Sequence, residues 1–82
     1  MVRRTFDLRG VVQGVGFRPW LYRMARQADL GGSVQNRTGV VRLTLEGPAD
    51  RIEALMETLP KRAVAPARID SADPVGSPAE ID

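Results

Sequence analysis

The sequence predicts an α+β domain in which two helices cover one face of a four-stranded antiparallel sheet. Two of its longer stretches alternate between apolar and polar residues, as half-buried strands do, and two others repeat their apolar residues at helical spacing. Two shorter strand-like stretches complete the set. The order along the chain is β-α-β-β-α-β, the ferredoxin-like arrangement, a sandwich of one helical layer on one sheet.

Glycines separate the first strand from the first helix. We expect the strand at 5–12, where Phe6 and Leu8 share one face and the residues between them are polar. A helix at 17–28 should follow, with Pro19 in its first turn, and should end before the next pair of glycines. The apolar stripe of this helix is made of Phe17, Leu21, Met24, Ala25 and Ala28.

A β-hairpin and a second helix are expected in the middle of the chain. Strands at 33–37 and 40–46 would be joined by a tight turn at Thr38-Gly39. The second helix would begin after Gly47-Pro48 and would be closed by Pro60. Its apolar stripe is made of Ile52, Leu55, Met56 and Leu59.

The C-terminal part of the chain has weaker signals. Residues 67–72 are expected to form an edge strand that carries Ile69. From residue 74 onward, the sequence PVGSPAEID has two prolines, one glycine and few apolar residues. We therefore expect one domain at 1–73, followed by a flexible tail or the start of an interdomain linker at 74–82.

The composition excludes several classes of function. The chain has 82 residues, enough for one small domain, and it contains neither cysteine nor histidine. Disulfides, serine–histidine or cysteine–histidine nucleophiles and the usual zinc ligands are therefore excluded. No apolar run approaches the roughly 20 residues of a membrane span, and no secretory signal pattern is present. We expect a cytoplasmic protein without a membrane partner and, since nothing indicates oligomerisation, a monomer.

Charge is distributed unevenly along the chain. Residues 1–28 contain six arginines and one acidic residue, whereas residues 29–82 contain six basic and nine acidic residues. A positive field in the first part would attract small anions or a nucleic-acid backbone, although a solvated arginine face is the simpler interpretation. RNA binding would also require aromatic residues on the open sheet face, and the strands offer only Phe6, which is expected in the core. We therefore expect no nucleic-acid partner.

The stretch GVVQGVGFRPW, at residues 10–20, indicates an anion-binding loop. It lacks the glycine that a dinucleotide fingerprint would need at Pro19, and it lacks the Gly-Lys-Ser/Thr of a Walker motif. Glycines still allow successive backbone N–H groups to form a concave nest at a helix N-terminus, where phosphate binds. Arg18 would add a bidentate donor pair. The alternative is a strand-to-helix turn that needs glycine only for a positive φ.

VVQGVGFR, followed by Asn36 within GGSVQN, resembles the signature of the acylphosphatase family, and the resemblance extends from about Phe6 to Ile69. It implies hydrolysis of acyl phosphates without metal or other cofactor, by positioning and charge stabilisation. It implies that Arg18 and Asn36 are catalytic, Arg18 as the essential cation and Asn36 as the group that orients the attacking water. Arginine cannot act as a base, so the bound phosphate would take the water proton. The phosphate-binding loop implied by the resemblance comprises Gln13, Gly14, Val15, Gly16, Phe17 and Arg18.

A second resemblance points to one branch of this family. GVGFRPW-x-Y-R-x-A, together with ARIDS, is similar to the N-terminal acylphosphatase domain of hydrogenase-maturation carbamoyltransferases. It implies carbamoyl phosphate as the substrate and the other domains of a larger carbamoyltransferase as partners. A stand-alone acylphosphatase and a non-catalytic anion-binding or docking domain are the alternatives. Gly39 follows Asn36 by three positions, which makes the hairpin slightly shorter than is usual in the family.

Overall fold

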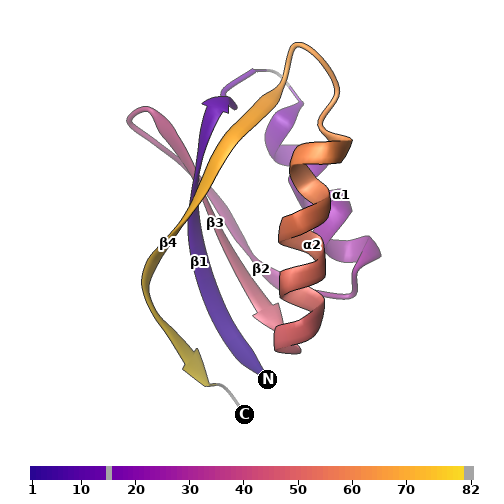
Figure 1. Ribbon diagram of the computed structural model, residues 1–82, viewed down its shortest axis with the longest axis vertical. Coiled ribbons are helices and arrows are strands. Elements are labelled where there is room, and N and C mark those ends of the chain that lie inside the picture. The colour runs from indigo at the N-terminus through magenta and orange to yellow at the C-terminus, as the bar shows by residue number, and fades with distance from the viewer. Residues whose placement is uncertain (15, 81–82) are drawn as a thin grey trace.

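The computed structural model describes the backbone of residues 1–14 and 16–80, and side chains through Gly76. Its strands form one sheet in the order β2-β3-β1-β4, and every neighbouring pair is antiparallel (Figure 1). The predicted fold class and element order are confirmed. None of the helices in the described ranges is long and apolar enough to span a membrane. The elements are β1 (Val2–Val11), α1 (Phe17–Gln27), β2 (Gly31–Arg37), β3 (Val40–Gly47), α2 (Ala49–Arg62) and β4 (Arg68–Glu80).

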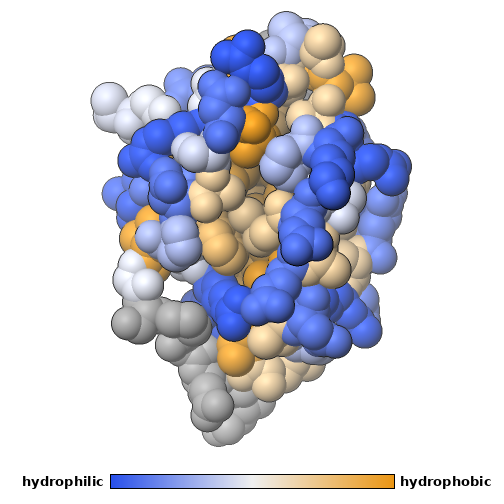
Figure 2. All heavy atoms as spheres, in the orientation of Figure 1, coloured by the Kyte–Doolittle hydropathy of each residue, from blue (hydrophilic) through white to orange (hydrophobic). Residues whose placement is uncertain are grey.

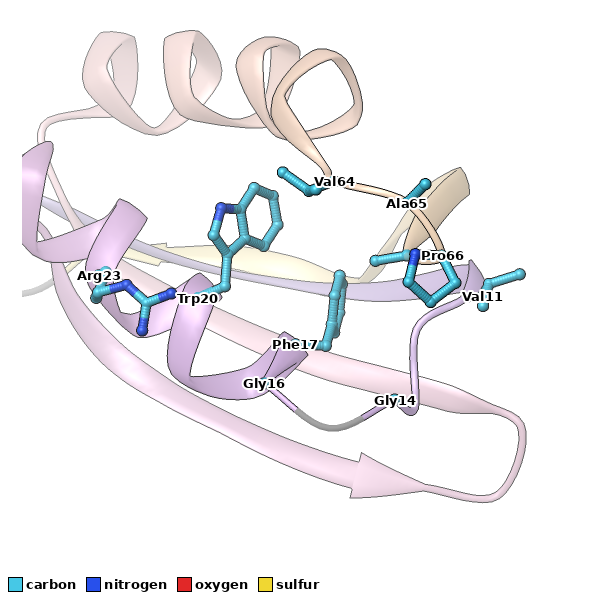
Figure 3. Close-up of a pocket in the computed structure, with 10 residues that line it drawn as sticks. Val11, Gly14, Gly16, Phe17, Trp20, Arg23, Val64, Ala65 and Pro66 are labelled. Carbon is cyan, nitrogen blue, oxygen red and sulfur yellow. The ribbon is translucent and has the colours of Figure 1, made fainter.

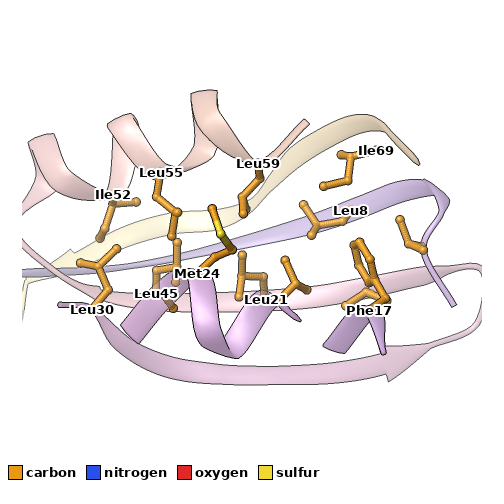
Figure 4. Packing of buried hydrophobic residues seen from close by; sticks show 14 residues of the cluster. Leu8, Phe17, Leu21, Met24, Leu30, Leu45, Ile52, Leu55, Leu59 and Ile69 are labelled. Atoms are coloured by element: carbon orange, nitrogen blue, oxygen red, sulfur yellow. The ribbon is translucent and has the colours of Figure 1, made fainter. Parts of the chain in front are cut away.

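Both helices lie on the same face of the sheet, and the core fills the space between the two layers (Figures 1 and 4). The register of β1 and β3 explains why one face is apolar: Leu8 lies opposite Val41, and Phe6 lies opposite Leu43. Alternation then places polar side chains on the open face of the sheet. The most deeply buried side chains are Leu8, Leu21, Val41, Leu43, Leu45, Ile52 and Leu59.

The second helix is longer than expected. Pro60 lies inside α2, because the helix continues to Arg62 and the N–H of Ala63 still donates to the carbonyl of Leu59, at 3.1 Å. Pro60 is exposed, so the carbonyl group that its ring leaves without a helical partner can be hydrated. The expectation that Pro60 closes the helix was therefore wrong.

The last strand is also longer than expected. β4 continues past residue 72 and pairs with β1 as far as Val2, which lies opposite Glu80. Residues 74–80, expected as a tail, are thus part of the sheet, and residues 81–82 lie outside the described range. Prolines are tolerated because β4 is an edge strand, where a missing N–H on the outer side breaks no ladder hydrogen bond.

A close backbone approach joins β4 to the end of β1. Gly10 has a φ of +134°, and a Cβ at this position would overlap the backbone of Arg68. The register shifts at the same point, between Arg9 and Gly10. Glycine is therefore required here, at the strand end from which the glycine loop departs.

Candidate active site

The loop between β1 and α1 is a helix N-terminus without a side-chain cap. Gly16 is the N-cap residue, in the left-handed region at φ +89°, and no side chain in the described ranges hydrogen-bonds to this end of α1. The first turn contains no acidic residue. The partial positive charge of the helix end is thus left for an external anion.

The glycines leave open space at this loop. A Cβ added at Gly14 or Gly16 would have no atom within 4 Å, so neither position is needed for close packing within the protein. The left-handed conformation explains the glycine at position 16. The carbonyl of Gly14 accepts a hydrogen bond from the N–H of Phe17, at 3.3 Å, which closes the loop onto the helix. Val15, a predicted phosphate-binding residue, lies outside the described range, so its role stays a prediction.

Gln13 connects the loop to the β2–β3 hairpin. Its Nε2 donates to the carbonyl of Arg37, at 3.0 Å, and to the carbonyl of Val40, at 3.3 Å. Gln13 is one of the predicted phosphate-binding residues, and its side-chain N–H groups are directed at the hairpin. Only the backbone of Gln13 is left to contact a bound anion.

Arg18 and Asn36 come from different elements that meet at the same end of the fold. Arg18 is exposed in the first turn of α1 and, together with Val34 of β2, lines a shallow cavity. Asn36 lies opposite Val41 and two positions from Val34, so these side chains are on the same face of the sheet as α1. Two residues of a strand span about 7 Å. The amide of Asn36 is exposed on this face, next along β2 from the residue that lines the cavity.

The arginines of α1 differ from those of the sheet. On the open face, Arg3, Arg9 and Arg42 each form an ion pair with a carboxylate, whereas Arg18, Arg23 and Arg26 have no carboxylate within ion-pair distance among the described side chains. The reason is local, since residues 17–27 contain no acidic residue. Arg18 and Arg23, which line the shallow cavity near the start of α1, are therefore available to attract a small anion.

No cluster of metal-ligating side chains is found in the part of the chain that the structure describes. The described ranges contain no group of three or more potential ligands among aspartate and glutamate, and the sequence has no histidine or cysteine. Neither of the two cavities at the loop is lined by a carboxylate. The donors available to a ligand here are backbone N–H groups, guanidinium groups and the Asn36 amide.

The chain is similar to known proteins over almost its whole length. The acylphosphatase family model matches residues 4–80. The chain is 41% identical over 81 residues to the carbamoyltransferase HypF2 of Cupriavidus necator, covering 99% of this chain and 10% of that protein. It is 36% identical to an acylphosphatase of Rhizorhabdus wittichii, covering 98% of this chain and 81% of that one.

Solved structures similar to this chain come from the same two kinds of protein, acylphosphatases and HypF. An acylphosphatase from Bacillus subtilis superposes with a TM-score of 0.85 at 27% identity, covering 99% of this chain and 88% of that one. The HypF structure from T. kodakarensis gives a TM-score of 0.80 at 38% identity, covering 92% of this chain and 10% of that one. The chain thus spans about a tenth of its carbamoyltransferase relatives and most of its acylphosphatase relatives. The resemblance found in the sequence is confirmed, and the chain belongs to the acylphosphatase family.

Proposed function

We propose that this chain hydrolyses acyl phosphates to a carboxylate and inorganic phosphate. The observation that carries the proposal is the uncapped N-terminus of α1, where the Gly16 turn places Arg18 beside the face of β2 that holds Asn36. The family of the chain supports the same reaction.

The phosphate group would be bound by the loop. Backbone N–H groups of the glycine loop would donate to its oxygens, and Arg18 would add a bidentate, permanently charged donor pair. These groups are held by the fold before the substrate arrives. They therefore stabilise the negative charge that the phosphoryl oxygens carry in the transition state without reorganising.

Asn36 would place the attacking water. Its amide oxygen accepts one water hydrogen, which directs the lone pair of the water oxygen at phosphorus. The new P–O bond forms as the bond between phosphorus and the acyl oxygen breaks, and the carboxylate leaves with that electron pair. No carboxylate lines the cavities at the loop, so the water proton passes to an oxygen of the phosphate itself.

We propose carbamoyl phosphate as one substrate, in the context of a larger carbamoyltransferase in the cytoplasm. The support is the 41% identity to HypF2, of which this chain spans about a tenth. A stand-alone acylphosphatase is the second candidate, favoured by relatives that the chain covers almost entirely. Turnover is common to both candidates, whereas a docking domain that only binds anions would show none.

One assay tests the reaction and its context. Phosphate release from carbamoyl, acetyl and benzoyl phosphate is measured with the purified chain. Hydrolysis of all three supports an acylphosphatase, and a kcat/KM highest for carbamoyl phosphate supports the carbamoyltransferase context. Binding of phosphate at the loop without any turnover would overturn the proposed reaction and leave the docking domain.

A further inference from the structure

A second cavity, of about 320 Å³, adjoins the glycine loop and extends to the connection between α2 and β4 (Figure 3). Gly14 and Gly16 form one wall, Phe17 and Trp20 of α1 form the floor, and the connection from α2 to β4 forms the opposite wall at Val64. In the close-up, the rings of Phe17 and Trp20 point toward this connection. A volume near 300 Å³ is at the lower end of the range for small-molecule sites.

The walls of this cavity are apolar and open to solvent. Phe17 is 3% exposed, and its ring centroid lies 5.7 Å from that of Trp20, which is partly buried. Val64 is 74% exposed, and Val11, which also lines the cavity, is 43% exposed. Figure 2 shows apolar residues at the surface of the end of the molecule where Figure 1 places the α2–β4 connection.

We infer that this cavity binds the acyl part of a substrate whose phosphate lies in the loop, and that it selects an apolar acyl group, aromatic or branched. We call it the acyl recess and define it by Phe17, Trp20, Val64 and Pro66. The inference rests on the proposed function. The supporting observation is that the recess and the phosphate-binding loop are adjacent, because Gly14 and Gly16 belong to the loop and also line the recess.

The chemistry of the recess determines which acyl groups gain affinity. A flat aryl ring that covers Trp20 and Val64 removes apolar surface from water and stacks on the indole. Arg23 is the one charged side chain that lines it, and no side chain there accepts a hydrogen bond from an N–H group. Carbamoyl phosphate, whose acyl part is an amino group on a carbonyl, would leave the recess unfilled. The domain would therefore act on larger acyl phosphates in addition to carbamoyl phosphate.

Two phosphonates test the recess without any turnover. Methylphosphonate and benzylphosphonate share the anionic group and cannot be hydrolysed, and their dissociation constants are measured by calorimetry. We expect benzylphosphonate to bind about tenfold more tightly, the scale of an apolar group in a fitted pocket. Amide and methyl NMR should show shifts at the Trp20 indole and the Val64 methyls for benzylphosphonate alone. Equal affinities, or no binding of either compound, would overturn the inference.

Substitutions test which cavity gives the preference for benzylphosphonate over methylphosphonate. Trp20→Ala should reduce the benzyl-to-methyl affinity ratio to about one, and Val64→Ser should reduce it by about threefold. Val64 is exposed, so Val64→Ser remains informative if Trp20→Ala fails to fold. Tyr22→Ala is the matched control, because Tyr22 is an aromatic residue of the same helix, 50% exposed, on the cavity that Arg18 lines. A ratio lost in Tyr22→Ala and kept in Trp20→Ala would place the acyl group in the other cavity and overturn the inference.

The outcomes separate the recess from the proposed function. A tenfold ratio that depends on Trp20, in a chain that hydrolyses no acyl phosphate, would refute the proposed reaction and leave the recess as an aryl-phosphonate site. Turnover of acyl phosphates with equal affinities for the two phosphonates would support the proposed reaction and refute the recess.

Discussion

Gln13 Nε2 donates a hydrogen bond to the backbone carbonyl of Arg37, at 3.0 Å, and a longer one to that of Val40, at 3.3 Å. Arg37 directly follows Asn36 at the end of β2. One side chain therefore fixes the glycine loop to the strand end that carries Asn36.

Removal of that connection should impair catalysis more than anion binding. We expect Gln13→Ala to lower kcat by about tenfold, because Asn36 loses its fixed position relative to the bound phosphate. Phosphate inhibition should change little, since the side-chain N–H groups face the hairpin. Gln13→Glu is the stricter variant, because it keeps the size of the side chain and places an acceptor against two carbonyls. A large loss of phosphate affinity with unchanged kcat would instead identify Gln13 as a phosphate ligand.

Inorganic phosphate should compete with the substrate at the loop. An amide NMR titration should show the largest shifts at Gly14, Gly16, Phe17 and Arg18, because these residues form the loop and the first turn at the uncapped helix end. Shifts concentrated on α2 would show that the anion binds elsewhere.

Stability should fall at acid pH through Asp7 on the open face of the sheet. Arg42 donates from Nε to Asp7 Oδ1, at 2.8 Å, and from Nη2 to Oδ2, at 3.1 Å, and this hydrogen bonding keeps the pKa of Asp7 below its usual value. A lowered native pKa favours the folded state above the unfolded pKa of about 4. The contribution is lost as the pH falls through the native pKa.

Asp7→Asn should therefore be less stable than the native chain at pH 7, and its stability should fall less between pH 5 and pH 2. Urea unfolding across this range measures both effects. Some acid dependence should persist, because Arg68 also lowers the pKa of Asp70. If the stability of Asp7→Asn fell with pH in parallel with that of the native chain, the ion pair would contribute nothing to the acid dependence of stability.

The sequence pattern predicts those parts of the fold in which burial imposes a period. Leu8 and Leu43 face the helices from strands whose other face is exposed to solvent. The residues next to them in each strand are therefore polar, and the alternation is visible in the sequence. Residues 74–80 carry no such pattern, because an edge strand is held to β1 by backbone hydrogen bonds that almost any side chain allows. Pro60 likewise predicted a helix end, although a proline in the exposed last turn costs only one hydrogen bond.

The candidate site divides in the same way. The glycines and Arg18 form a local motif, and Asn36 was identified through a family resemblance. The hydrogen bonds from Gln13 to the hairpin, and the meeting of Trp20 with Val64, join segments that are distant in the sequence. Only the packing of the whole domain brings these segments together, so no local sequence pattern predicts these contacts.

Chelators should leave turnover unchanged. The described ranges hold no cluster of metal-ligating side chains, and the donors at the loop are N–H groups, which do not bind cations. Hydrolysis of benzoyl phosphate is measured before and after dialysis against EDTA. A loss that magnesium restores would show that a metal ion carries part of the charge assigned to Arg18.

Replacement of Arg18 and replacement of Asn36 by alanine should have different effects on kcat and on phosphate inhibition. In the proposed mechanism Arg18 contacts the phosphate in the ground state and in the transition state, so Arg18→Ala should weaken phosphate inhibition and lower kcat together. In the same mechanism Asn36 contacts mainly the attacking water, so Asn36→Ala should lower kcat with little change in phosphate inhibition. Each loss of kcat should be about 10²-fold, the scale for one preorganised polar group.

Arg26→Ala is the matched control for these two variants. Arg26 is an exposed arginine of the same helix and has no carboxylate partner among the described side chains, but it lies in the last turn, at the negative end of the helix. Its loss removes the same charge from the same element without touching the loop, so kinetics close to native are expected. Thermal unfolding checks that all three variants fold, as they should, because all three side chains are exposed. If Arg18→Ala and Arg26→Ala had equal effects, long-range charge would explain the result; if Arg18→Ala turned over normally, the glycine loop would be a structural turn.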